Sequence, residues 1–151
     1  MGKTGSETTV AGAAPPPIDV IRVRVDMNLV GKTWKFYVVA DDVASQPYVH
    51  PNDKIEVSPG PQTKIEFKLQ GSASGKLDFK ESDPIWVKEG DCPGKRRSDP
   101  DICIVDVKKN KLTINDRNTR QADLYYQLNF VDKEGEGFEW DPIIRNGGGG
   151  P

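Results

Sequence analysis

The chain holds few of the residues that carry out catalysis or bind metal ions. His50 is its only histidine, whereas a type-1 copper site needs two histidines beside a cysteine, and zinc sites commonly use several. A Ser-His-Asp triad through Ser45 or Ser58 has the required residue types, but neither serine lies in a nucleophile motif. We therefore predict no catalytic residues, no metal site and no cofactor, and hence a protein that is not an enzyme.

Carboxylates are plentiful and leave two alternatives open. Residues 132–137 imitate the first half of an EF-hand calcium loop, with Gly137 at its sixth position, but Ile143 stands where the twelfth position needs Glu. A glycine hairpin turn is the preferred interpretation, and a calcium loop remains the alternative. Paired carboxylates on separate strands, as in glycoside hydrolases, leave no sequence motif and also stay open.

Two cysteines bracket the most unusual loop. Cys92 and Cys103 do not have the spacing of a zinc ligand pair or of a redox C-x-x-C motif. In an oxidising compartment, a disulfide between them would stabilise the fold by roughly 3 kcal/mol. We favour free thiols, because the N-terminus lacks the apolar core of a secretory signal and we expect a cytoplasmic protein.

The same loop carries three adjacent basic residues, Lys95, Arg96 and Arg97. They could bind an acidic partner or a phosphate, and the alternative is a solvated loop tip. Residues 88–101 are long for a hairpin connection, and long loops in small domains are often functional. We therefore place the candidate partner-binding site on these three residues.

Exposed aromatic side chains on a β-sheet can stack on sugar rings, so the aromatic residues were compared by their alternation. Trp34 and Trp140 alternate in step with apolar neighbours and are predicted in the core. Trp86 points opposite to its apolar neighbours, and Tyr125 points opposite to Tyr126. Trp86 and Tyr125 are therefore the candidate ligand-binding aromatics, although burial of Trp86 is the preferred interpretation.

Alternation of apolar and polar residues with period two dominates the chain and predicts β-strands. Strands are expected around residues 21–27, 34–38, 55–57, 65–69, 77–79, 85–87, 102–107, 111–114, 124–130 and 138–140. Glycine- and proline-rich turns separate them, and no long segment has the 3.6-residue period of a helix. The pattern predicts an all-β domain, an antiparallel two-sheet sandwich of about seven to nine strands.

Composition limits the ordered domain to the middle of the chain. Residues 1–17 are rich in Gly, Ser, Thr, Ala and Pro and are predicted to form a disordered arm, and residues 147–151 a flexible tail. The domain is predicted to span residues 18–146.

The strand that starts at residue 122 resembles strand F of immunoglobulin domains. There a tyrosine anchors the preceding crossover, and the inward-facing Tyr126 matches that position. Trp86 corresponds to the buried tryptophan of strand C, but the chain has Leu128 where antibody domains have a cysteine. The resemblance implies an immunoglobulin-like Greek-key sandwich. The ending, with Asp141-Pro142-Ile143, is also similar to small uncharacterised bacterial proteins, which imply no function.

The net charge and the hydropathy of the chain limit the classes of partner that it is expected to bind. With 151 residues and a net charge of −2, the chain lacks the positive field expected of a nucleic-acid-binding protein, and no apolar run is long enough to cross a membrane. We predict a binding or assembly module that recognises a protein or other partner through loops at one end of the sandwich. The alternatives are a carbohydrate-binding or carbohydrate-processing protein, and a subunit that forms a homo-oligomer through its edge strands.

Overall fold

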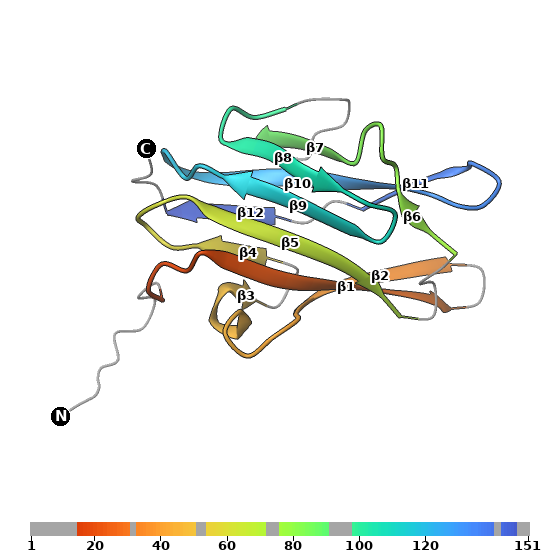
Figure 1. Cartoon of the computed structure of the whole chain (residues 1–151), viewed down its shortest axis with the longest axis horizontal. Coiled ribbons are helices and arrows are strands. Elements are labelled where there is room, and N and C mark those ends of the chain that lie inside the picture. Colours follow the sequence, from red (N-terminus) through yellow and green to blue (C-terminus); the bar gives the residue numbers. More distant parts are fainter. Residues whose placement is uncertain are drawn as a thin grey trace.

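The computed structural model describes residues 15–30, 33–50, 54–71, 76–90, 98–140 and 143–147. Within these ranges the protein has twelve strands, β1 to β12, and one short 3-10 helix, η1 (Gln46–Tyr48). The strands form two sheets that lie as two layers (Figure 1). The predicted all-β fold is confirmed, while immunoglobulin-like connectivity stays a prediction.

The first sheet has five strands in the order β2-β1-β5-β9-β8. In that order, their bounds are Thr33–Ala40, Val20–Val30, Thr63–Gln70, Lys111–Asp116 and Ile102–Val107. Strands β1 and β5 pair in parallel, whereas the other neighbours are antiparallel. Alternation alone does not report this direction, because it is the same for both kinds of pairing.

The second sheet is built around the long strand β10 (Gln121–Val131). One edge of β10 pairs with β12 (Ile143–Gly147) and β11 (Gly137–Trp140) in a single continuous register. On its other side β12 pairs with β4 (Lys54–Val57), which in turn pairs with β3 (Val49–His50). The other edge pairs with β7 (Ile85–Glu89) and β6 (Asp78–Phe79).

The core lies between the two sheets and follows from alternation. On β1 the inward residues are fully buried, and so are their counterparts on β5, β9 and β10. Phe67 of the first sheet contacts Tyr126 of the second, with ring centroids 5.6 Å apart. Burying each such large side chain contributes about 1.5–3 kcal/mol, which is why one face of every long strand is apolar.

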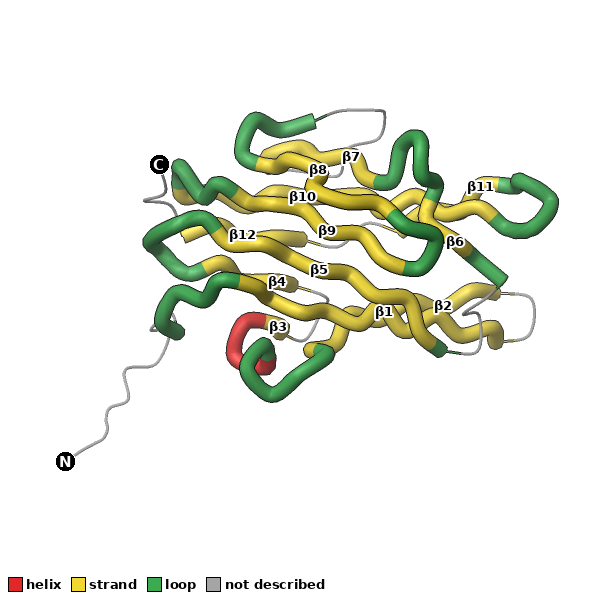
Figure 2. The backbone as a smooth tube through the Cα atoms, viewed as in Figure 1, coloured by secondary structure: helices red, strands yellow, loops and turns green. Residues whose placement is uncertain are grey.

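The sandwich has two different ends. The first, called here the Arg120 end, gathers residues 15–19, 58–62, 98–101 and 117–120, which precede or follow strands of both sheets (Figure 2). The opposite end, called here the hairpin end, is closed by the turns at residues 108–110 and 132–136.

Residues 15–17 of the predicted arm contact the domain at the Arg120 end. The carbonyls of Pro15 and Pro16 accept hydrogen bonds from the hydroxyls of Ser58 and Tyr48. The domain's contacts thus begin at Pro15, and residues 1–14 lie outside the described residues.

Candidate functional site

The predicted partner-binding loop is described only at its two stems. Lys95, Arg96, Arg97 and Cys92 lie outside the described residues. The loop leaves the second sheet at the end of β7 and reaches the first sheet at the start of β8. It is therefore a crossover between the sheets, and its stems belong to the Arg120 end.

One guanidinium group joins the two stems. Arg120 donates to Glu89 Oε1 at the departing stem, at 3.1 Å from Nε and 2.9 Å from Nη2. It also donates from Nη2 to Asp99 Oδ2 at the returning stem, at 2.6 Å, and Nη1 lies 3.2 Å from Asp101 Oδ2. We call Glu89, Asp99, Asp101 and Arg120 the Arg120 clamp. It holds both ends of the loop at a fixed separation.

The most buried member of the clamp is Asp101, which is 2% exposed. Its carboxylate accepts hydrogen bonds from the backbone N–H of Thr119 at 3.0 Å and from the Thr119 hydroxyl at 2.5 Å. Its own N–H donates to Asp99 Oδ1 at 2.9 Å, and its carbonyl accepts from the N–H of Arg117 at 2.8 Å. The returning stem is thus bound to the connection between β9 and β10, as a buried charge requires.

A third loop joins the same cluster through Asn118. This residue has a left-handed backbone, with φ of 56°, and its amide Nδ2 donates to the carbonyl of Ser58 at 2.8 Å. Asparagine tolerates this conformation better than most residues. Three loops that are distant in sequence are therefore held together by side chains rather than by strands.

The clamp sets three carboxylates against one guanidinium and so keeps a net negative charge. Its hydrogen bond to Asp99 raises the pKa of Arg120 above its usual range, helped by Glu89 and Asp101 and opposed by burial. Arg120 therefore stays a cation at every ordinary pH, and it lies between the three carboxylates. Within the part of the chain that the structure describes, no group of three potential metal ligands is found.

A shallow depression opens beside these loops on the first sheet. It has a volume of about 470 Å³ and is lined by Asp19, Val20, Pro61, Gln62, Lys64 and Asn115. Asn115 donates to Gln62 at 3.2 Å across its rim. The depression extends the loop cluster onto the neighbouring strand ends and adds exposed polar groups to the same end.

Trp86 and Tyr125 lie on the outer face of the second sheet, as their alternation indicated, whereas the preferred expectation of a buried Trp86 is not met. Ile85 and Val87 are buried while Trp86 is half-buried, and Tyr126 is buried while Tyr125 is half-buried. Tyr125 pairs with Lys88 in the register of β10 and β7, so the two aromatics are diagonal neighbours on adjacent strands. Diagonal neighbours on one face are within reach of aromatic side chains.

Polar groups underlie Trp86 and fix its ring. Its Nε1 donates to Asp83 Oδ2 at 2.8 Å. Gln127 is directly opposite Trp86 in the register and donates to Asn129 at 2.5 Å, and Asn129 donates to the carbonyl of Asp83 at 2.9 Å. This outer face is therefore a fixed polar and aromatic surface, separate from the Arg120 end.

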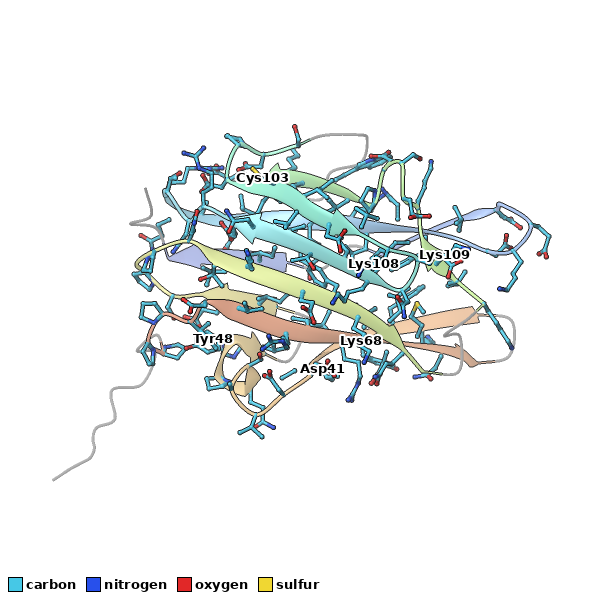
Figure 3. All side chains as sticks on the ribbon, viewed as in Figure 1. Asp41, Tyr48, Lys68, Cys103, Lys108 and Lys109 are labelled. Carbon is cyan, nitrogen blue, oxygen red and sulfur yellow. The ribbon has the colours of Figure 1, made fainter. Side chains whose placement is uncertain are left out.

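Cys103 is exposed on β8 (Figure 3). It points outward and lies opposite Asn115 of β9. Its proposed disulfide partner lies outside the described residues, so the redox state of the pair stays a prediction.

The lone histidine lies in a strand rather than in a loop tip. His50 belongs to β3, and its Nε2 is 2.7 Å from Glu56 Oε1. A second depression, of about 400 Å³, lies beside it and is lined by Val38, Val39, Ala40, Gln46, Val49 and His50. Glu56 is the acid–base group that the described part of the chain places in contact with His50.

Arg120 is the residue that sequence reasoning missed. Its partners lie 31 and 21 residues away along the chain, so no local motif connects them. The only local signal is the run Asp116, Asn118 and Thr119, whose short polar side chains favour bonded loops over strands.

No protein-family model matches the chain, and no curated protein matches it either. Among the described residues there is also no helix with the length and apolar character to span a bilayer.

Proposed function

We propose that the protein is a non-catalytic binding or assembly module that recognises a protein or other partner through the loops of its Arg120 end. The observation that carries this proposal is the Arg120 clamp, in which one guanidinium binds both stems of the basic loop. Binding loops generally work when a rigid scaffold holds them in place, because less conformational freedom is then lost on binding.

The charge of the basic loop indicates which chemical groups a partner would present to it. The clamp residues at the stems carry a net negative charge, and Lys95, Arg96 and Arg97 supply positive charge in the sequence between those stems. An acidic surface or a phosphate group on the partner complements that charge. Arginine suits such a site because its planar group can donate two parallel hydrogen bonds.

The test replaces Lys95, Arg96 and Arg97 together with Ser and measures partner capture from a lysate. We expect capture to fall, and to fall more at low salt, because exposed charges act over a Debye length of about 10 Å at 0.1 M salt. Stability should change by no more than about 0.5 kcal/mol, as is usual for surface residues.

The matched control removes the same charge from the hairpin end. Lys68, Lys108 and Lys109 are exposed and lie toward that end of the first sheet (Figure 3). Their triple Ser variant has the same net charge as the loop variant. Equal loss of capture in the two variants would show that net charge alone is responsible, and the assignment to the loop would be wrong.

Carbohydrate binding is the second candidate, favoured by the placement of Trp86 and Tyr125 on one face. A sugar would stack on these rings while Asp83 and Gln127 hold the tryptophan from behind. Quenching of tryptophan fluorescence by soluble polysaccharides tests this. The change should disappear in Tyr125→Ala and persist in Tyr37→Ala, which removes an exposed aromatic from the other sheet.

A further inference from the structure

Strand β8 is an edge strand of the first sheet with exposed apolar side chains. It ends the first sheet, and among the described residues its outer side pairs with no other strand. Two adjacent side chains in its middle, Ile104 and Val105, are 49% and 50% exposed. Together they make up half of the exposed large apolar residues in the described chain. A free strand edge offers backbone donors and acceptors in a row, so what fits it is another strand.

A bulge in β8 changes which side chains face the core. Ile102 and Ile104 lie opposite Asp116 and Ile114, which are buried, and therefore point inward. The register then shifts by one residue, with Val105 as the extra residue. After the bulge the inward positions are odd-numbered instead of even-numbered.

The shift makes the strand symmetric about its own centre. Val107 lies opposite the buried Leu112 and points inward, while Cys103 and Asp106 lie opposite Asn115 and Thr113 and point outward. Along residues 102–107 the side chains face inward and then outward, two exposed apolar residues follow, and the last two side chains face outward and then inward. The order is the same when the strand is followed in the opposite direction.

We propose that two copies of the chain pair through β8, antiparallel and about a two-fold axis between Ile104 and Val105. In this register the inward Ile102 meets the inward Val107, the outward Cys103 meets the outward Asp106, and the bulge residue Val105 meets Ile104. The directly opposed pairs, each formed twice, are Ile102 with Val107, Cys103 with Asp106, and Ile104 with Val105. The two five-stranded sheets then form one continuous sheet.

A second copy fits this edge better than an unrelated peptide does. Two-fold interfaces require a surface that is complementary to itself, and the palindromic pattern of β8 meets that requirement. The register also keeps the two Asp106 carboxylates apart, since each meets a cysteine rather than the other carboxylate. Like charges directly opposite one another would destabilise the pair.

The pairing is tested first by association of the full chain, measured by sedimentation velocity over a concentration series. We expect a monomer–dimer equilibrium that Val105→Lys shifts to monomer. Tyr37→Lys is the matched control, because Tyr37 is 51% exposed on β2 at the opposite edge of the same sheet, and it should leave the dimer intact. A wild-type chain that stays monomeric throughout, or a dimer that survives Val105→Lys, overturns the proposal.

The register is tested by cross-linking in a Cys92→Ser background. Asp106→Cys places a new thiol directly opposite Cys103 of the second copy, where opposed residues are about 4.5–5.5 Å apart and a disulfide can form. Within one chain the two positions are about 10 Å apart along the strand, too far for a bond. We expect mild oxidation to yield a covalent dimer. If the background chain with Cys103 alone cross-links equally well, the register is wrong.

Discussion

The two ends of the sandwich are held together in opposite ways. At the hairpin end, Asp132 accepts hydrogen bonds from the N–H groups of Glu134 and Glu136, so the turn is closed by bonds between residues at most four positions apart. At the Arg120 end, the side-chain bonds that link separate loops join residues 18 to 60 positions apart. The turn at residues 132–136 shows that this fold can close a loop with local bonds, although the other turn of the hairpin end also accepts bonds from Leu69 and Phe79.

The long-range network of the Arg120 end therefore does more than close the sandwich. Burying Asp101 and Asp99 against a guanidinium costs desolvation energy, and a buried ion pair seldom adds much net stability. What the network adds is a fixed geometry for three connections, including the stems of the basic loop. This difference is the reason for placing the binding site at the Arg120 end.

The largest expected effect is on Asp101. In Asp101→Asn, one carboxylate oxygen becomes an NH₂ donor that faces the donors of Thr119 and Arg120. We expect a loss of about 3 kcal/mol, toward the low side for a broken buried pair because Arg120 keeps access to water. Urea unfolding followed by circular dichroism measures it.

The matched change at the hairpin end is Asp132→Asn. Its amide oxygen can still accept from the turn N–H groups in a solvent-exposed setting, so the loss should stay below about 1 kcal/mol. Equal losses at Asp101 and Asp132 would remove the contrast between the two ends.

The next effect concerns the loop junction at Asn118. Asn118→Ala removes the bond to the Ser58 carbonyl and forces alanine into a left-handed backbone. Together these should cost about 2 kcal/mol. Asn118→Gly keeps the backbone conformation and should recover about half of the loss in the same unfolding assay. A glycine variant no better than alanine would show that the bond, and not the backbone, dominates.

A smaller loss is expected at Gly135 in the hairpin end. Its φ is 85°, and a Cβ added there would meet no atom within 4 Å. Gly135→Ala should therefore cost only the conformational strain, about 1 kcal/mol. A thermal melt that reports clearly more would mean that this turn packs against other parts of the domain.

The sequence predicted the local structure of this fold better than its long-range pairing. Alternation placed Tyr126 inside and Tyr125 outside, because the facing of a side chain is a property of consecutive residues. The parallel pairing of β1 with β5 and the roles of Arg120 could not be derived, since they join segments far apart in the chain. Strand β12 was not predicted either, and its parallel pairing with β4 also joins segments far apart in the chain.

The smallest expected effect is a pH-dependent contribution of Asp42 to the stability of the fold. Asp42 precedes η1 near the start of β1, where the N–H of Asp41 donates to the carbonyl of Arg22. The side-chain hydrogen bond with Ser45, its backbone N–H and Arg22 lower the pKa of Asp42 below the ordinary value of 3.8. A carboxyl with a depressed folded-state pKa adds stability above its unfolded value and loses it as the pH falls through the folded value.

Asp42→Asn should therefore be less stable than the wild type at neutral pH, by less than about 1 kcal/mol, because the group remains partly exposed and screened. The difference should shrink as the pH falls below 3.8. Asp41→Asn removes the same charge one residue earlier and serves as the control. The measurement is the urea midpoint of each protein from neutral pH to pH 3. If the difference in midpoint between wild type and Asp42→Asn does not narrow in acid, the bonds of Asp42 add no charge-dependent stability. The hydrogen bonds of Asp42 would then act as neutral bonds do, without a contribution from its charge.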